Sequence, residues 1–423
     1  MVIQQHVEDA AALHSARTLL LNAPHVRLRH LRRVDDRLEA HLDGLAIGSE
    51  RATALIALLL DRPNPSVIFT ATVQAVERIQ LRGTFGSPDQ DGKQWLEHLL
   101  VLNAASDFAN SGLLSAFGWL DREKLRGIVA DLLNSRTAFC RVVGIATCAM
   151  HRVDPGLTSA CRFDDESPLV RARAWRTAGE IGKRELVSTA AAAITDDDPA
   201  CQFWAAWAAV LLGDKQSALE VITRRAAVPG PFRARAFQLA LQASSPSTAH
   251  RWLSELAREP ASQRWLIRGA GLVGDPAYVP WLIGQMADVK TTRRAGESFS
   301  LITGLDLAWL DLEVKPPENF ESGPNDDPND PNVDMDEDDG LPWPDVKKIQ
   351  AWWHANGSRF QSGTRYFMGE PLNRDNCLRV LKEGFQRQRI AAALYLSLLN
   401  PGTPLFEWRA PARRQQRLLA GMT

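Results

Sequence analysis

The feature that most constrains the fold is an internal repeat in the middle of the chain. Several segments contain a helix-like apolar run followed by a residue that closes it. These closing residues stand at positions 151, 182, 213, 244, 274 and 304. These closing positions are separated by steps of 31, 31, 31, 30 and 30 residues. A regular period of this length is typical of a solenoid built from stacked helical units. The middle of the chain is therefore predicted to be a repeat array.

Each repeat is predicted to contain two antiparallel helices. The first helix begins at a capping residue that is followed by proline, as at Ser167 and Pro168 or at Asp198 and Pro199. Proline suits this place because the N–H that it lacks would have no partner there. The first helix ends at a glycine, which adopts the left-handed C-cap conformation most easily. A second helix is expected in each of the segments 183–194, 214–226 and 275–287.

Two features of these repeats resemble the short HEAT repeats named after phycobilin lyases. One is the Arg or Gln three residues after the entry proline, as in Pro168 to Arg171 and Pro199 to Gln202. The other is the glycine turn between the two helices. The resemblance covers roughly residues 137–304. It implies an all-α fold, a HEAT-like α-solenoid made of helical hairpins.

The repeats, at residues 137–313, are flanked by segments of different character. Residues 1–136 are predicted to form a helical region continuous with the solenoid, and residues 345–423 a small α-rich C-terminal region. Residues 314–344 are acidic and rich in proline, which predicts a linker or long loop. The expected flanking helices are 2–21, 27–43, 50–60, 66–79, 93–102, 122–133, 345–356 and 373–400. A loop is expected at 80–92 and a short hairpin within 357–370.

The composition is that of a folded protein without a strong overall charge. The formal net charge is −1, so no general electrostatic attraction to nucleic acid or membrane is expected. Glu8 and Asp9 stand where a signal peptide carries positive charge, and the aliphatic run 54–60 is too short to span a bilayer. Five irregularly spaced cysteines fit reduced thiols. These features predict a soluble, cytoplasmic protein.

No catalytic or cofactor motif is found in the sequence. The HExxH, CxxC, GxGxxG and P-loop patterns are all missing. None of the 9 His residues is followed by Glu, which excludes the di-iron site of deoxyhypusine hydroxylase, a HEAT enzyme. His151 occupies the glycine position of its repeat, so it is predicted to cap a turn. The sequence predicts no catalytic residue and no cofactor.

The acidic segment 323–345 contains a weak candidate for a metal site. Asp334, Asp336 and Asp338 have the spacing of the first three ligands of a calcium loop, but the required glycine comes one residue late, at Gly340. Three interpretations remain open. The segment is a solvated acidic loop, or a metal site, or a connector that packs along the arginines of the repeats or on a basic partner. In the third case Trp343 of the LPWP motif is the anchor.

Arg or Gln recurs 11 residues before the closing position of five repeats. Because these residues share one phase, they are predicted to stack along one edge of the solenoid, which we call the Arg edge. The edge is either a phosphate-binding face, as in HEAT-type DNA glycosylases, or a row of side chains that bind aspartates and carbonyl groups of neighbouring repeats. Two of the five residues are neutral, which favours the second interpretation. The five residues are Arg171, Gln202, Arg233, Gln263 and Arg293.

Tryptophans are frequent in the predicted repeat helices, to which Trp309 is also assigned. Trp204 and Trp265 both lie nine residues before a closing position, and such a stripe favours core packing over a binding cage. A tryptophan that does not fit inside would be an interface anchor. The candidate partner-binding residues are Arg171, Arg233, Arg264, Arg268, Arg293, Trp204, Trp265, Trp343, Trp352 and Trp353.

Segments spread over nearly the whole chain carry a second resemblance. They are DDRLEAHLDGL (35–45), HRVDPG (151–156), CQFWAAWAAVLLGD (201–214), GESFSLITGLDLAWLDLE (296–313), GPNDDPND (323–330), LPWPD (341–345) and APARRQQRLL (410–419). These segments are similar to those of an uncharacterised family of bacterial proteins encoded among type VI secretion genes, near spike proteins and their adaptors. The resemblance implies a cytoplasmic adaptor or chaperone for an effector, spike or adaptor protein, and it implies no activity.

The sequence therefore predicts a non-enzymatic scaffold for protein–protein interaction. The alternative is a nucleic-acid-binding HEAT protein, related in style to HEAT-type DNA glycosylases.

Overall fold

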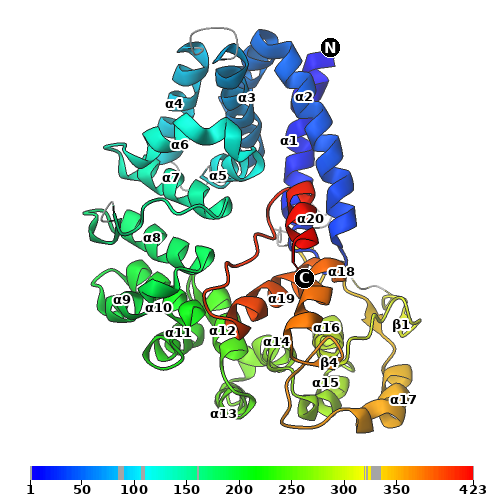
Figure 1. Ribbon diagram of the computed structural model, residues 1–423. Helices are drawn as coiled ribbons and strands as arrows, with labels where there is room; N and C mark the ends of the chain where they lie inside the picture. Colours follow the sequence, from blue (N-terminus) through cyan, green and yellow to red (C-terminus); the bar gives the residue numbers. More distant parts are fainter. Residues whose placement is uncertain are drawn as a thin grey trace. The chain divides into compact units, whose positions relative to one another are not determined.

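The computed structural model describes residues 2–83, 90–105, 110–159, 162–318, 320, 323–324 and 335–422. These residues form helices α1 to α20, short 3-10 helices, and two antiparallel pairs of two-residue strands (Figure 1). The predicted all-α fold is confirmed. Among the described residues, no helix combines the length and the apolar character needed to cross a membrane.

The chain divides into two compact units. The first unit contains Met1–Asn22, Val26–Ala218 and Asn400–Thr423, and the second contains Ala23–His25 and Leu219–Leu399. This division cuts across the segments expected from the sequence. It falls inside the repeat array, and it assigns the end of the predicted C-terminal region to the first unit.

The first unit is helical from its beginning. Residues 27–43 and 50–60, expected as two helices, form the single helix α2, which is kinked at Ser49. Of the loop expected at 80–92, residues 80–83 belong to α3 and residues 90–92 to α4; residues 84–89 lie outside the described part. Its elements are α1 (Val2–Leu20), α2 (Leu28–Leu59), α3 (Pro65–Gly83), α4 (Gln90–Ala104), α5 (Asn110–Trp119), η1 (Arg122–Leu125), α6 (Arg126–Leu133), α7 (Ala138–Met150), η2 (Arg162–Asp164), α8 (Pro168–Ile181), η3 (Arg184–Leu186), α9 (Val187–Ala192), η4 (Ala193–Thr195), α10 (Pro199–Leu212) and α20 (Ala412–Ala420).

The second unit contains the later repeats and most of the C-terminal region, and α11 (Ser217–Ala227) runs across the division. The expected helix 373–400 is two helices, because the chain leaves the helical conformation at Gly384. Its elements are α12 (Arg233–Ala243), α13 (Pro246–Leu256), η5 (Pro260–Ser262), α14 (Gln263–Val273), η6 (Pro276–Tyr278), α15 (Val279–Gln285), α16 (Thr292–Thr303), β1 (Glu313–Val314), β2 (Trp343–Pro344), α17 (Val346–Asn356), η7 (Gly357–Arg359), β3 (Tyr366–Phe367), β4 (Glu370–Pro371), α18 (Arg374–Glu383) and α19 (Gln386–Leu399).

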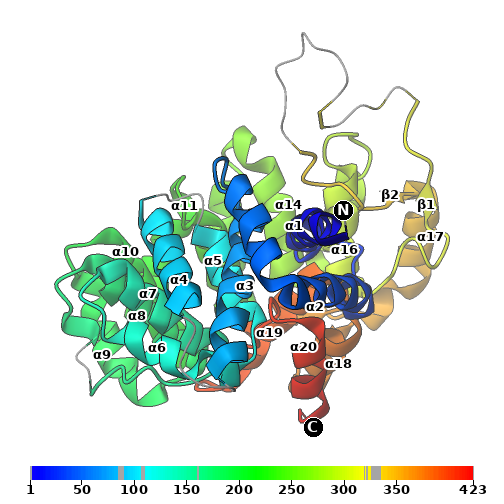
Figure 2. The ribbon, with the colours of Figure 1, turned by 90° about the horizontal axis from the view of Figure 1, so that it is seen from above.

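Both strand pairs belong to the second unit. In the first pair, Val314 of β1 lies opposite Trp343 of β2. This pair lies beside α17 in both ribbon views (Figures 1 and 2). In the second pair, Phe367 lies opposite Glu370, which confirms a short hairpin within 357–370.

Each predicted closing position ends a helix. Four of these positions are glycines, Gly182, Gly213, Gly274 and Gly304, and they adopt the left-handed conformation with φ between 72° and 119°. The predicted period is therefore the period of the first helices. The C-cap residues of α7, α8, α10, α12, α14 and α16 are His151, Gly182, Gly213, Ser244, Gly274 and Gly304.

Two of the first helices, α7 and α16, have no second helix directly after them in the described residues, contrary to the expectation of two helices in each repeat. Helices α6, α9, α11, α13 and α15 follow the first helices α5, α8, α10, α12 and α14. After α7, the described residues up to α8 form a loop and the short 3-10 helix η2.

In the first unit, the end of the chain covers the C-terminal ends of first helices. The amide of Leu405 donates to the carbonyl oxygen of Glu180 near the end of α8, at 2.9 Å. Arg414 donates to the carbonyl oxygens of Gly118, Trp119 and Leu120 at the end of α5. These helix ends have carbonyl groups without helical partners. The C-terminal segment supplies the missing donors, so it is an integral part of this unit.

In the second unit, the β3–β4 hairpin has the same role. The amide of Tyr366 donates to the carbonyl oxygen of Gly274 at 2.8 Å, and the amide of Met368 donates to that of Leu301 at 2.7 Å. Arg365 donates to the carbonyl oxygens of the last residues of α12 and of its C-cap, Ser244. The hairpin therefore closes the ends of α12, α14 and α16.

A buried histidine makes the stability of the first unit dependent on pH. His14 is 3% exposed, stacks on Phe69 and has hydrogen bonds of 2.9 Å to Ser66 and Ser115. Burial, with a smaller contribution from Arg17, lowers the pKa of His14 from 6.5 to about 3. At a pH between these two pKa values, His14 is protonated in the unfolded chain and neutral in the folded chain.

Acid is therefore expected to destabilise the unit below pH 6.5, by about 1.4 kcal/mol per pH unit for His14 alone. Denaturant unfolding of the wild type and of His14→Asn, measured from pH 7 to pH 4, checks this. The variant should lose less stability per pH unit than the wild type. Equal slopes for the two proteins would contradict the assignment.

Candidate functional site

In the second unit, Arg293 of the Arg edge and the neighbouring Arg264 and Arg294 bind the acidic segment of the same chain. Arg293, which is 8% exposed, lies 2.7 Å from a carboxylate oxygen of Asp336. Arg264 and Arg294 each lie 2.9 Å from a carboxylate oxygen of Asp338, which is 3% exposed. The described part of the acidic segment therefore folds back along the arginines of the repeats, as in the third interpretation of its sequence.

Trp343 anchors this segment. The guanidinium carbon of Arg293 lies 4.9 Å from the centre of the Trp343 ring and 5.1 Å from that of Phe320. The two rings contact each other edge to face, with centroids 4.7 Å apart. Leu341, at the start of LPWP, is also buried. The ion pairs and the aromatic contacts together hold residues 335–344 on α14 and α16.

The weak metal site is not assembled in the described residues. Asp336 and Asp338 direct their carboxylates to arginines, and Asp334 lies outside the described part. The described residues also contain no cluster of three or more His, Cys, Asp or Glu side chains suited to a metal ion.

Replacing Asp338 is expected to loosen this segment. Asp338→Ala removes two ion pairs, so amide hydrogen exchange in residues 335–345 should become about tenfold faster or more. The control is Asp339→Ala, because Asp339 is exposed. Exchange in α8 and α10 should not change. Equal exchange of 335–345 in the two variants would show that these ion pairs do not hold the segment.

In the first unit, Arg171 of the Arg edge and Arg141 of the preceding repeat each bind an aspartate of the following repeat. Arg171 donates to both carboxylate oxygens of Asp196, at 3.2 and 3.3 Å, and Arg141, one repeat earlier, does the same to Asp165 at 2.8 and 2.9 Å. The hydrogen bond to Asp196 raises the pKa of Arg171. Gln202 donates to the backbone carbonyl of Asp196. This geometry agrees with the structural interpretation of the edge.

The remaining candidates in the repeats form cation–π pairs. Arg176 lies 4.7 Å from the ring of Trp204. Arg233 and Arg268 lie 4.5 and 5.7 Å from the ring of Trp265. Burial, together with the nearby Arg294, lowers the pKa of Arg268. These arginines and tryptophans contact each other within the chain, so less of their surface is available to a partner.

Trp352 and Trp353 on α17 pack within the second unit. Trp352 contacts Phe299 with ring centroids 6.1 Å apart, and Trp353 contacts Phe360 at 5.5 Å. Both are partly buried against the core that contains Ile349. Their observed role is to attach α17 to the repeats.

Trp309 was assigned to a repeat helix, and this assignment is wrong. It lies in a turn after Gly304 has ended α16, and 84% of its surface is exposed. Leu310 and Val314 are 50% and 48% exposed. Gly304 was the signal that could have corrected the assignment, because a helix does not continue past a left-handed cap.

The exposed stretch is held firmly at both ends. Leu307 and Leu312 are buried in the core of the second unit, on either side of Trp309 and Leu310. The amide of Trp309 donates to the carboxylate of Asp306 at 3.3 Å. The turn therefore presents its apolar side chains to solvent from a fixed backbone.

A cavity of about 570 Å³ lies beside this stretch, and Ala308 and Val314 line it. Leu305, Leu307, Leu341, Trp343 and Phe385 supply further apolar lining. Charged residues also line it, among them Glu297 and Arg387, which form an ion pair of 3.1 Å. We call the cavity and the exposed residues Trp309, Leu310 and Val314 the Trp309 surface.

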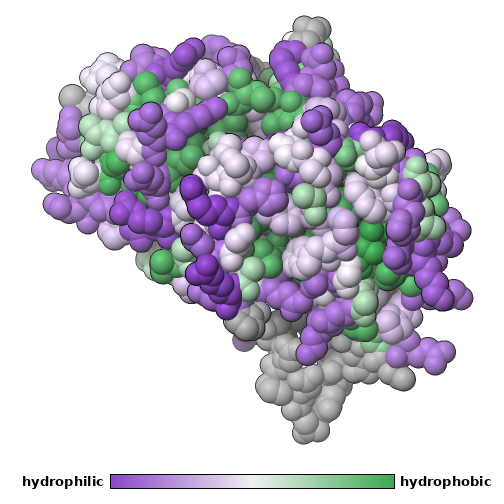
Figure 3. Space-filling view, turned by 90° about the horizontal axis from the view of Figure 1, so that it is seen from below, coloured by the Kyte–Doolittle hydropathy of each residue, from purple (hydrophilic) through white to green (hydrophobic). Residues whose placement is uncertain are grey.

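Trp309 is the only exposed tryptophan among the described residues, although large aliphatic side chains such as Ile47 and Val101 are exposed elsewhere. On the face drawn in Figure 3, hydrophilic residues cover much of the surface, and hydrophobic residues form patches of different size between them. An exposed tryptophan next to an apolar cavity is typical of a binding site, since such patches tend to be functional.

The cysteines offer no reactive thiol at the described positions. Cys140, Cys148, Cys201 and Cys377 are free thiols, and Cys161 lies outside the described residues. Burial raises the pKa of Cys148 to about 11 and those of Cys201 and Cys377 to about 12. A thiol with a raised pKa carries little thiolate at neutral pH and is a poor nucleophile.

Comparison with known proteins agrees with the repeat architecture. A family model of HEAT repeats matches residues 155–242, the part of the chain that contains α8 to α11 and most of α12. No curated protein matches this chain. No solved structure matches it either. Arrays of such repeats generally provide extended surfaces for protein partners. The chain thus has the HEAT-like repeat architecture that its sequence predicts.

Proposed function

We propose that this protein is a non-enzymatic scaffold that binds a protein partner through the Trp309 surface. The observation that carries the proposal is the 84% exposure of Trp309, held between buried Leu307 and Leu312 next to a cavity with a mixed, largely apolar lining. Tryptophan is among the residues that contribute most to protein–protein binding, because it buries a large area at a small cost in side-chain entropy.

The anatomy of the surface supports a protein as the partner. Its lining combines apolar side chains with the charged residues Glu313, Lys315 and Arg387. Protein interfaces likewise combine apolar and polar residues. A cavity of about 570 Å³ is large enough to take one or two apolar side chains of the partner beside Trp309 itself.

The observed geometry does not favour the nucleic-acid alternative. Binding to phosphates needs arginines that are free to meet them. Arg171 and Arg293 are instead paired with Asp196 and Asp336, and Arg264 is paired with Asp338. A phosphate backbone would have to displace these carboxylates.

The resemblance of the sequence to proteins encoded among type VI secretion genes supports a specific partner class. We infer a cytoplasmic, bacterial adaptor or chaperone whose partner is an effector, a spike protein or a spike adaptor. The scaffold proposal stands on the Trp309 surface, and this assignment stands on the resemblance alone.

Substitution of the exposed tryptophan tests the proposal. Trp309→Ser should reduce the recovery of the bound partner about tenfold or more in affinity purification from the native host, because loss of an anchor tryptophan costs at least 2 kcal/mol of binding. Ile47→Ser is the matched control, since Ile47 is 87% exposed and belongs to the first unit. Mass spectrometry identifies the partner and its amount. Equal recovery of that partner by Trp309→Ser and Ile47→Ser would contradict the proposal.

A further inference from the structure

The repeat of α7, which has no second helix among the described residues, contains a second cavity. After α7 the chain turns at Asp154, whose carboxylate accepts hydrogen bonds from the amides of Gly156 and Leu157, at 2.9 and 3.0 Å. Gly156 has a φ of 73°, which a helix does not allow. Lys183 fixes the turn through an ion pair of 2.7 Å with Asp154. The local sequence therefore replaces a helix with an ordered loop.

The loop packs on the next repeat. Leu157 is 1% exposed and belongs to a cluster with Ala174, Ala178 and Leu186. In that repeat, Leu186 of η3, just before the second helix α9, is buried in the same cluster as Ala178 of α8. The residue 31 positions before Ala178 is Thr147 on α7, and the described residues between α7 and α8 form no α-helix that could cover it. A space remains at this point between α6 and α7.

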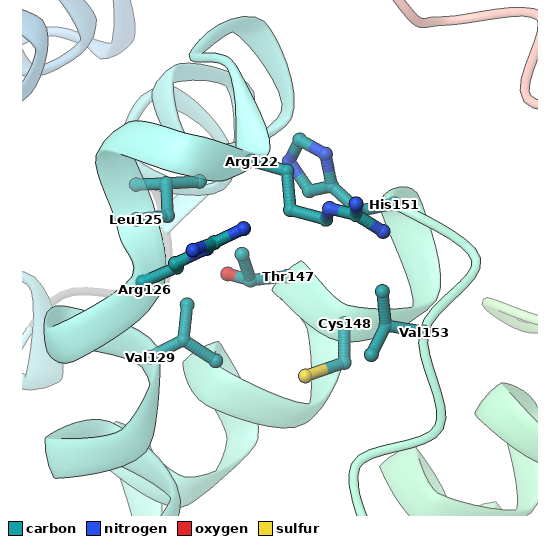
Figure 4. Close-up of a pocket in the computed structure, with 8 residues that line it drawn as sticks. All are labelled: Arg122, Leu125, Arg126, Val129, Thr147, Cys148, His151 and Val153. Atoms are coloured by element: carbon teal, nitrogen blue, oxygen red, sulfur yellow. The ribbon is translucent and has the colours of Figure 1, made fainter.

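This space is a cavity of about 270 Å³ with an apolar interior (Figure 4). Thr147 does not make it polar, because its hydroxyl donates to the carbonyl oxygen of Val143 at 2.8 Å. The residues that line the cavity are Arg122, Leu125, Arg126, Val129, Thr147, Cys148, His151 and Val153.

His151 and Cys148 bring no charge to the cavity at neutral pH. Burial, reinforced by Arg414, lowers the pKa of His151 to about 4, and its Nε2 lies 3.0 Å from the carbonyl oxygen of Phe117. His151 thus ends α7 in a neutral form, in keeping with the capping role expected of it. Cys148 is buried and, as its raised pKa indicates, remains a thiol.

Two arginines supply positive charge at the edge of the cavity. In Figure 4 the Arg126 guanidinium points toward Thr147, and the Arg122 guanidinium lies near His151 and Val153. Both residues are exposed. Within the described residues, Arg126 has no ion pair, and Arg122 has only a distant one, at 3.9 Å from Glu123. Unlike the arginines of the Arg edge, these two are available to a ligand.

We propose that this cavity binds a small organic acid with an apolar body, of the size of a medium-chain carboxylate. The chain of the ligand lies against Leu125, Val129 and Val153, and its carboxylate is held by Arg122 and Arg126. Guanidinium groups suit a carboxylate because they match its two oxygens with parallel N–H donors. The proposal does not depend on the Trp309 surface, which belongs to the second unit.

Titration calorimetry of the full chain with octanoate tests the proposal, with octanol and octylammonium as probes of the charge requirement. Octanoate is expected to bind saturably at one site, and octanol and octylammonium at least tenfold more weakly. Hexanoate should bind about tenfold more weakly than octanoate, because each buried methylene contributes a factor of about three to four.

Three variants locate the site. Arg126→Ala should weaken octanoate binding about tenfold and leave octanol binding unchanged. Val129→Phe should abolish binding of both by filling the cavity. Arg62→Ala, at an exposed arginine of the same unit, should bind octanoate as the wild type does. If Val129→Phe does not fold, Arg126→Ala alone still tests the site, because Arg126 is exposed.

The proposal would be overturned by a lack of saturable octanoate binding, by equal binding of octanoate and octanol, or by octanoate binding that Arg126→Ala leaves unchanged. Sedimentation with phosphatidylglycerol vesicles distinguishes a lipid headgroup from a free acid. Vesicle binding that requires Arg126, without octanoate binding, would assign the site to a lipid and contradict the proposal.

Discussion

Replacing Asp35 with alanine is expected to destabilise the first unit by about 3–5 kcal/mol. Arg17 and Asp35 form an ion pair of 2.7 Å in which the side chains are 4% and 5% exposed. The second oxygen of Asp35 accepts a hydrogen bond from the amide of Ala412, at the start of α20. The substitution leaves a buried guanidinium without its counter-charge and a buried N–H without an acceptor, which is the reason for the size of the effect.

The neighbouring residue provides the control. Asp36 pairs with Arg32 at 2.6 Å, but the two side chains are 50% and 34% exposed. Asp36→Ala should therefore change the stability by no more than about 0.5 kcal/mol. Urea unfolding of both variants gives the comparison. If Asp35→Ala is within 1 kcal/mol of Asp36→Ala, the buried pair does not attach the chain end as described.

Replacing Gly182 with alanine is expected to destabilise the same unit by about 2–5 kcal/mol. Gly182 has a φ of 72°, which costs an L-residue energy, and a methyl group there would overlap the carbonyl oxygen of Gly402. The chain end would have to move away from α8. That movement would strain the hydrogen bond between Leu405 and Glu180.

The same substitution at Gly127 should not destabilise the unit. Gly127 lies in α6, and a methyl group there would meet open space. Alanine is the better helix former by up to about 1 kcal/mol, so Gly127→Ala should be neutral or slightly stabilising. Thermal unfolding of the two variants distinguishes the outcomes. A Gly182→Ala protein as stable as Gly127→Ala would mean that the chain end does not pack closely on the C-cap at Gly182.

The repeats could be predicted because their signals are local. Ser167 before Pro168, and Gly182 fourteen residues after that proline, fix the start and the end of α8 through backbone geometry that only a few residue types satisfy. The same combination recurs one repeat later, at Asp198 and Gly213. The period therefore contains enough information to place the first helices.

The closure of the helix ends could not be predicted in this way. Tyr366 meets Gly274, and Leu405 meets Glu180, across long stretches of chain. These contacts are made by backbone groups, which every residue carries, so no residue type marks the partners in the sequence. For the same reason the sequence suggested a separate C-terminal region, whereas residues 400–423 belong to the first unit.

The candidate site was predicted only in part. The phase of the Arg edge and the position of Trp343 were sufficient to suggest that the acidic segment packs on the repeats, and Asp336 and Asp338 do so. The exposure of Trp309 was not predicted, because the apolar spacing around it resembles that of a repeat helix although Gly304 ends α16. Whether a tryptophan is exposed depends on what packs over it, and periodicity does not contain that information.

The most direct test of the account is hydrogen exchange of the purified chain with and without the partner recovered from the native host. The account predicts slower exchange in residues 305–316 and 385–388, which contribute to the Trp309 surface, with no change in α8 and α10. Protection of the Arg edge in α8 and α10 with residues 305–316 unchanged would contradict it.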